Sequence, residues 1–194
     1  MTLKIAGGLY KGLRLETPSS KITRPTSEIL RGAVFNISQH KITDAVFLDL
    51  YAGSGAMGIE AMSRGAKEVV FVEKDRQALL VLKKNIEKTP IKELSKILPY
   101  DVLIALKKLS CTFDLIYIDP PYGEKKEELL AEKTLDKLFE YLDTGSLLNK
   151  DAWIFLEFSS YSKKDFATLP LKKIQWQNTR TFGRSNLHLF KYID

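Results

Sequence analysis

The sequence has little cysteine, few histidines and no long apolar run. Its single cysteine, Cys111, excludes a disulfide framework and a zinc site built on several thiolates, and we expect it to pack as a small apolar side chain. The longest apolar stretches span four or five residues, whereas a membrane-spanning helix needs about 20. His40 and His188 do not recur at metal-ligand spacing, so we expect no metal.

The beginning of the sequence also lacks an apolar segment of signal-peptide length. We therefore expect a cytoplasmic protein that has no membrane segment. The length of 194 residues fits one globular domain with a core large enough to need no disulfide or structural metal.

What the sequence does contain is an uneven distribution of charge. The formal net charge is +6, but residues 1–40 carry +4, residues 41–162 carry −3, and residues 163–194 carry +5. A basic excess permits binding to a polyanion such as a nucleic acid, yet many proteins are mildly basic for solubility. Net charge alone therefore leaves nucleic-acid binding open.

The first 25 residues differ in pattern from the rest. Residues 3–5 and 13–15 alternate apolar and basic side chains on either side of several glycines, which predicts a short β-hairpin with basic residues on its open face. We therefore divide the chain into a basic hairpin extension over residues 1–25 and a main domain over residues 26–194.

Short apolar runs alternate with amphipathic helical patterns from residue 45 onward. We predict strands at residues 45–50, 68–75, 95–98, 113–119, 152–158, 171–176 and 187–193. Continuous apolar strands separated by helices are typical of a parallel sheet covered on both faces. The last two strands favour an antiparallel pair that closes the sheet. The predicted fold class is therefore α/β, with a Rossmann-like, mostly parallel sheet and an N-terminal hairpin.

A glycine loop lies between the first strand of this sheet and the helix after it. Residues 53–58, GSGAMG, match the pattern G-x-G-x-x-G, and Glu73 follows Gly53 by twenty residues. Alone, this is typical of dinucleotide binding, because the glycines permit close backbone approach and the carboxylate accepts from ribose hydroxyls.

Asp49, directly before the loop, favours a different cofactor. A pyrophosphate would be repelled by this carboxylate, whereas a sulfonium cofactor that carries an amino-acid tail would be attracted. The alternatives are that Asp49 caps a helix or turn and that Glu73 is a solvated loop acid. Asp101, after the third strand, could accept from an adenine amine while Val102 packs on the ring, but Asp101 is read equally well as an N-cap.

The most informative segment is FDLIYIDPPYG, residues 113–123. It places Asp119, Pro120, Pro121 and Tyr122 after an apolar strand, at the edge where open α/β sheets bind ligands. Two prolines make the loop rigid and remove two backbone donors. A Pro-rich turn alone would not explain the acid and the aromatic residue that flank them.

This tetrad suits the exocyclic amine of a nucleobase. The Asp119 carboxylate and the Pro120 carbonyl can accept the two N–H groups, while Tyr122 stacks on the ring. Accepting both protons directs the nitrogen lone pair toward an activated methyl group and stabilises the positive charge that develops on nitrogen.

The tetrad and the segment LDLYAGSGAMGIEAMSRGA together resemble class I S-adenosylmethionine-dependent methyltransferases that act on exocyclic amines. The opening, KIAGGLYKGLRLETP and TRPTSEILRGAVFN, is similar to the bacterial 16S rRNA guanine-N2 methyltransferase family of the RsmD type. The resemblance covers nearly the whole chain. It implies a seven-stranded sheet, a hairpin that engages rRNA, and methylation of one 16S rRNA guanine, of the guanine-966 N2 type, in a partly assembled 30S particle. Separately, we expect a monomer.

The resemblance also implies roles for particular residues. At the cofactor, S-adenosyl-L-methionine, it places Asp49, Tyr51, Gly53, Ser54, Gly55, Gly58, Glu73, Lys74, Asp101 and Val102, with Arg24 and Thr26 of the Arg-Pro-Thr element. At the target base it places Asp119, Pro120, Pro121 and Tyr122. From the basic charge of the hairpin and of the chain's end, we expect Lys4, Lys11, Arg14 and Arg184 to bind RNA. The chain departs from the family at Gly32, where an acid is usual, and at Arg184, where an acidic or neutral residue is usual.

Three other functions remain as alternatives. An N6-adenine DNA or RNA methyltransferase can carry the same tetrad, but its usual separate sequence-reading domain fits poorly in 194 residues. An NAD-dependent oxidoreductase would use the glycine loop and leave Asp49 and the tetrad unexplained. A non-catalytic RNA-binding assembly factor would not require the intact Asp119 and Tyr122.

Overall fold

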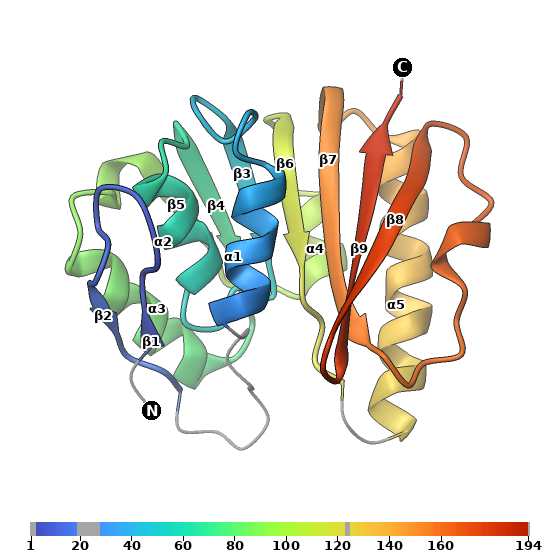
Figure 1. Cartoon of the computed structure of the whole chain (residues 1–194), viewed down its shortest axis with the longest axis horizontal. Coiled ribbons are helices and arrows are strands. Elements are labelled where there is room, and N and C mark those ends of the chain that lie inside the picture. Colours follow the sequence, from blue (N-terminus) through green and yellow to red (C-terminus); the bar gives the residue numbers. More distant parts are fainter. Residues whose placement is uncertain (1–2, 19–27, 123–124, 194) are drawn as a thin grey trace.

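The computed structural model describes residues 3–18, 28–122 and 125–193. A seven-stranded sheet lies between two layers of helices, and a small two-stranded sheet packs beside one of these layers (Figure 1). None of the helices in these segments is long and apolar enough to cross a bilayer.

The large sheet has the order β5-β4-β3-β6-β7-β9-β8. Its strands are β3 (Val46–Leu50), β4 (Glu68–Val72), β5 (Ser95–Leu98), β6 (Phe113–Ile118), β7 (Leu148–Ser159), β8 (Ile174–Phe182) and β9 (Ser185–Tyr192). Neighbours from β5 to β7 are parallel, whereas β9 runs antiparallel to both β7 and β8. The predicted α/β class, with a mostly parallel sheet and an antiparallel closing pair, is confirmed.

The helices divide between the two faces of the sheet. On one face lie α1 (Glu28–Ile37), α2 (Ala56–Ser63) and α3 (Arg76–Glu87), and on the other lie α4 (Val102–Leu106) and α5 (Lys125–Thr144). A short 3-10 helix, η1 (Lys92–Leu94), precedes β5, and a second, η2 (Phe166–Thr168), packs with α5 through Phe166. Successive strand side chains enter opposite cores: Phe47 packs with α1 to α3, and Leu48 packs with α4 and α5. Burial on both faces explains the continuous apolar runs in the sequence.

The direction in which strands are added reverses between β3 and β6. The chain passes from β3 to β4 and β5 on one side, then returns to β6 and continues to β7 on the other. Leu50 pairs with Ile118, and the Asp119 N–H donates to the Leu50 carbonyl at 3.4 Å. The carboxyl ends of β3 and β6 are therefore adjacent, at the point where open α/β sheets bind ligands.

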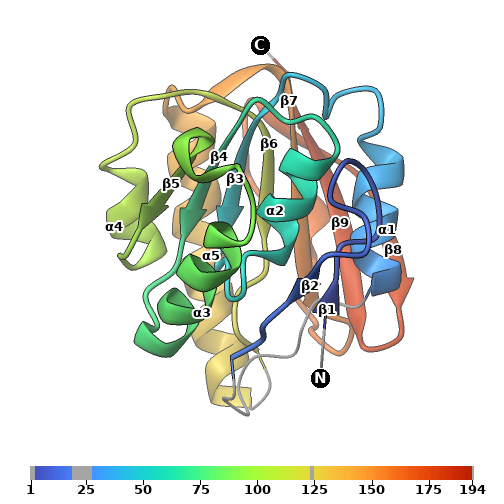
Figure 2. The ribbon, with the colours of Figure 1, turned by 90° about the vertical axis from the view of Figure 1, so that its left-hand side faces the viewer.

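The N-terminal hairpin consists of β1 (Leu3–Lys4) and β2 (Arg14–Leu15), which pair antiparallel. It packs beside α2 (Figure 2). There the Ser63 hydroxyl accepts from the Tyr10 N–H at 2.8 Å and donates to the Gly7 carbonyl at 2.6 Å. Leu15 is buried in the same core as α1 to α3. The hairpin is therefore predicted correctly, and it shares the core of the main domain.

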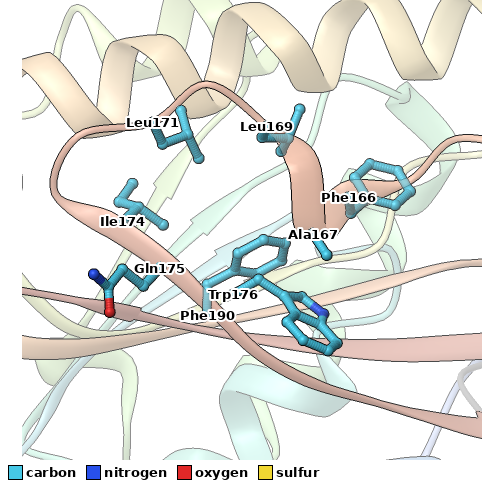
Figure 3. Close-up of a pocket in the computed structure, with 8 residues that line it drawn as sticks. All are labelled: Phe166, Ala167, Leu169, Leu171, Ile174, Gln175, Trp176 and Phe190. Carbon is cyan, nitrogen blue, oxygen red and sulfur yellow. The ribbon is translucent and has the colours of Figure 1, made fainter.

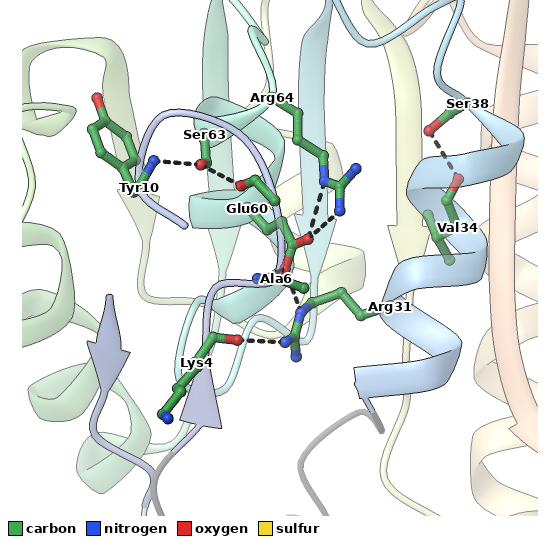
Figure 4. Close-up of polar contacts among 10 residues, drawn as sticks. Lys4, Ala6, Tyr10, Arg31, Val34, Ser38, Glu60, Ser63 and Arg64 are labelled. Carbon is green, nitrogen blue, oxygen red and sulfur yellow. Dashed lines mark hydrogen bonds and ion pairs between the residues drawn. The ribbon is translucent and has the colours of Figure 1, made fainter. Parts of the chain in front are cut away.

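A buried ion network joins the hairpin to α1 and α2 (Figure 4). Arg31 Nε donates to Glu60 Oε2 at 2.5 Å, and the exposed fraction of each side chain is 1% or less. Arg64 Nη2 donates to Glu60 Oε1 at 2.7 Å. Arg31 Nη2 also donates to the Lys4 carbonyl at 2.6 Å, and Glu60 Oε2 accepts from the Ala6 N–H at 3.2 Å.

Besides shifts at the ends of β4, β7 and β9, two local expectations differ from the structure. Strand β8 begins at Ile174 and runs to Phe182, later and longer than the predicted 171–176. Because β8 is an edge strand whose residues are mostly exposed, its polar sequence carries no apolar signal, and its extent is set by pairing with β9. Cys111 is exposed in the bend before β6, so its predicted burial is wrong.

We expect Glu60→Gln to lower the free energy of unfolding by about 3 kcal/mol, because it leaves the buried Arg31 without a counter-charge. The matched variant Glu87→Gln, on the exposed surface of α3, should change it by less than about 0.5 kcal/mol. Urea denaturation of both variants measures the difference. Equal effects would show that the network does not stabilise the fold.

Candidate active site

The glycine loop connects β3 to α2, and two of its glycines are required by geometry. Gly55 is the N-cap of α2 and has a φ of 80°, in the left-handed region that favours glycine. At Gly58, within the first turn of α2, a Cβ atom would overlap the ring of Phe71 in β4. The third glycine of the pattern therefore lets the helix pack closely against the sheet.

Asp49 lies at the end of β3 and is buried, with 1% of its surface exposed. Its Oδ2 accepts from the Gly58 N–H in the first turn of α2 at 3.0 Å, which agrees with the helix-capping alternative and leaves cofactor binding by Asp49 a prediction. Burial, and to a smaller extent the Glu73 charge, raises the pKa of Asp49 to about 7 against the lowering effect of this hydrogen bond. The carboxylate thus occupies a helix N-terminal N–H that a pyrophosphate would otherwise use, which argues against a dinucleotide.

Glu73, after β4, holds the glycine loop and is more than a solvated loop acid. Its Oε2 accepts from the Gly53 N–H at 2.9 Å. Its Oε1 accepts from the N–H groups of Lys74 and Asp75 at 2.7 and 2.8 Å. These bonds fix the carboxylate beside the loop, with Gly53 in a left-handed conformation of φ 54°.

Asp101 lies after β5 and has two partners. Its Oδ1 caps α4 by accepting from the Leu103 N–H at 3.1 Å, so the N-cap expectation is confirmed. Its Oδ2 is 3.0 Å from the Lys74 ammonium. Tyr51 lies near this pair; its pKa is raised by burial and then by the charges of Asp101 and Glu73. Val102 is buried at the start of α4.

The Asp-Pro-Pro-Tyr tetrad follows β6 directly. Asp119 is half-buried, Pro120 is buried and Pro121 is exposed. The Tyr122 ring tilts against Phe158 of β7, with 5.3 Å between centroids and 55° between planes. The fold therefore gathers the predicted cofactor carboxylates and the tetrad at the carboxyl ends of β3 to β6.

The predicted RNA-binding residues fall on two segments. Lys4 and Arg14 are cross-strand neighbours in the hairpin, and both are exposed, as is Lys11 in the loop between the strands. Arg184 is exposed in the turn between β8 and β9. Arg24 and Thr26 lie outside the described residues.

Two buried polar residues were not predicted. Asn85 of α3 donates through Nδ2 to the carbonyls of Glu16 and Ser54, each at 2.9 Å, and its Oδ1 accepts from the Glu16 N–H at 2.8 Å. It thus joins the exit of the hairpin to the glycine loop. Glu157 of β7 accepts from the Tyr117 hydroxyl at 2.5 Å. A single polar residue in an otherwise apolar run is the signal that could have marked Glu157, whereas Asn85 lies among charged residues and carries no such signal.

A cavity of about 250 Å³ lies elsewhere, beside β8 (Figure 3). Its lining is mostly apolar and aromatic: Phe166, Ala167, Leu169, Leu171, Ile174, Gln175, Trp176 and Phe190. No predicted site residue lines it. Within residues 3–18, 28–122 and 125–193, no three His, Cys, Asp or Glu side chains form a group that could hold a metal.

Comparisons with known proteins match this chain to one family model and to relatives described as rRNA methyltransferases. The family model described as Conserved hypothetical protein 95 matches residues 3–191. Ribosomal RNA small subunit methyltransferase D of Haemophilus influenzae is 32% identical over 158 residues, which is 80% of this chain and 78% of the relative. The protein of the same name from Buchnera aphidicola is 32% identical over 157 residues, 80% of this chain and 76% of the relative.

Among solved structures, one described as "Putative methyltransferase yhhF from Escherichia coli" superposes with a TM-score of 0.84. The match covers 100% of this chain and 99% of the other at 24% identity. At this identity, the likeness shows that the two proteins share a fold and nothing more.

The raised pKa of Asp49 predicts a pH-dependent stability. Native Asp49 binds its proton up to about pH 7 and the unfolded chain only up to about pH 4, so its contribution to stability is present at low pH and is lost as the pH rises through 7. We expect wild type to lose up to about 4 kcal/mol relative to Asp49→Asn between pH 4 and 8. Urea midpoints of both proteins across this range measure the difference; a constant difference would contradict it.

Proposed function

We propose that this protein transfers the methyl group of S-adenosylmethionine to the N2 amine of a guanine in 16S rRNA. The chain belongs to the RsmD family, whose model is described as Conserved hypothetical protein 95. The single observation that carries this proposal is the adjacency of Asp49 and the Asp119 tetrad across the β3–β6 pair. We propose position 966 as the guanine and a 30S assembly intermediate as the substrate, by the family resemblance.

The acidic residues at the strand ends fit this cofactor. Asp49 suits its cationic amino-acid end, Glu73 suits the ribose hydroxyls, and Asp101 suits the adenine amine. Three carboxylates around one loop would repel a pyrophosphate, which supports a nucleoside cofactor that lacks phosphate. When bound, S-adenosylmethionine supplies an electrophilic methyl group.

The tetrad acts on the target amine. The Asp119 carboxylate and the Pro120 carbonyl accept the two amine N–H groups, so the nitrogen lone pair points at the methyl carbon. As the N–C bond forms, the S–C bond breaks, and the positive charge on nitrogen is stabilised by Asp119, which takes the released proton. Tyr122 supports the base from one face of its ring.

The decisive experiment incubates the protein and labelled cofactor with free 16S rRNA, naked DNA and partly assembled 30S particles, followed by nucleoside analysis. Label in N2-methylguanosine of rRNA supports the proposal. Label in N6-methyladenine would favour the adenine methyltransferase alternative. Tight RNA binding without transfer to any substrate would favour the non-catalytic assembly factor.

Asp119→Ala is expected to abolish turnover while S-adenosylmethionine affinity stays within about tenfold of wild type, because the side chain serves the target amine. Isothermal titration calorimetry and a labelled-methyl assay measure the two quantities. The complementary variant Asp49→Ala should lose cofactor affinity instead. Loss of cofactor binding in Asp119→Ala would contradict the proposed role of Asp119 at the target amine.

Replacing Lys4, Lys11 and Arg14 with Gln should weaken RNA binding and flatten its dependence on salt by up to about three units of slope, because each basic side chain that contacts a phosphate releases a counterion. The control replaces Lys126, Lys133 and Lys137, which are exposed on α5 across the sheet. Filter binding between low and moderate salt gives the slope. An unchanged slope in the hairpin variant would show that these hairpin residues do not contact the RNA phosphates.

A further inference from the structure

A buried carboxylate lies behind the tetrad. Glu157, near the end of β7, is 5% exposed, and hydroxyl groups surround it. The Tyr117 hydroxyl donates to its Oε2 at 2.5 Å, and it also accepts side-chain hydrogen bonds from Ser185 and Tyr122. Tyr117 belongs to β6 and Ser185 to β9, whereas Tyr122 belongs to the tetrad.

Strand β7 and the start of β9 hold Tyr122 at both ends of its side chain. The ring rests against Phe158, the residue after Glu157. The hydroxyl is 2.9 Å from Ser185 Oγ, and Ser185 is the first residue of β9, paired with Ser159. Because the two prolines before Tyr122 already restrict the backbone, these contacts restrict the freedom that is left, that of the side chain.

The chemistry of the cluster sets Glu157 apart from other buried acids. Burial raises the pKa of the Glu157 carboxyl against the lowering effect of its three hydroxyl donors. Asp143 is equally buried, but its carboxylate accepts from the backbone N–H groups of Lys172, Lys173 and Ile174 and so fixes the start of β8. Glu157 instead accepts from side-chain hydroxyls, and one of these belongs to Tyr122, the side chain predicted to support the target base.

We propose that Glu157 is a positioning residue for the methyl transfer, acting directly and through Ser185 to hold the Tyr122 ring in the orientation that the target base requires. The inference rests on the proposed function, since it deepens the role of the tetrad. A fixed ring spares the enzyme the cost of ordering it when the base arrives, and small misplacements of reacting groups cost large factors in rate. Glu157 itself does not touch the base or the cofactor in this role.

Glu157→Gln and Ser185→Ala should each lower kcat by about tenfold to a hundredfold while the dissociation constant of S-adenosylmethionine stays within about threefold. Ser185→Thr, which keeps the hydroxyl, should restore most of kcat. Tyr122→Phe keeps the ring and loses the tether, so the double variant Tyr122→Phe/Ser185→Ala should be no slower than the slower single variant. Asp143→Asn, the matched control, should lower thermal stability without lowering kcat.

The inference would be overturned if the losses of kcat multiply in the double variant, or if kcat is unchanged in both Glu157→Gln and Ser185→Ala. An active wild type would leave the proposed function intact in either case. A second measurement does not need turnover. In protein labelled with 3-fluorotyrosine, the fluorine resonance missing from Tyr122→Phe is that of Tyr122; it should shift and narrow in Ser185→Ala as the ring is released. An unchanged resonance would show that Ser185 does not hold the Tyr122 ring and would overturn the inference. An inactive wild type would overturn the proposed function alone.

Discussion

The parallel pairing of β3 with β6 is the constraint on which the rest of the site depends. These strands are neighbours in the sheet although the β4 and β5 units separate them in the sequence. Their register sets Leu50 beside Ile118, and the bond from the Asp119 N–H to the Leu50 carbonyl joins the two strand ends. A slip of one residue would turn Asp49 and Tyr117 to the other face of the sheet, because side chains alternate along a strand.

Around this pair, the glycine loop is held from three directions. Asp49 accepts from Gly58 at its far end, Glu73 accepts from Gly53 at its near end, and Asn85 donates to the Ser54 carbonyl. Because Asn85 also binds both backbone groups of Glu16, the loop and the hairpin share one buried side chain. The segment predicted to meet RNA and the segment predicted to meet the cofactor are therefore parts of one packed unit.

The charge distribution follows from the same geometry. The acidic middle of the sequence supplies the carboxylates at the strand ends, where they are buried or bound by backbone N–H groups. The basic ends supply exposed side chains on the hairpin and on the turn between β8 and β9. The proposed cationic cofactor and polyanionic substrate require opposite surroundings, and the strand ends and the outer segments provide them.

The sequence by itself determined the short-range features: the apolar strands, the glycine loop and the Asp-Pro-Pro-Tyr tetrad, each encoded within about ten residues by periodicity or by backbone chemistry. It gave no role to Glu60, Asn85 or Glu157, which the structure shows to be buried. Only the tertiary structure decided their partners, because Arg31 meets Glu60, Asn85 meets Glu16, and Glu157 meets Tyr122 across tens of residues. Such bonds depend on which strands and helices lie side by side, and local patterns carry no information about that.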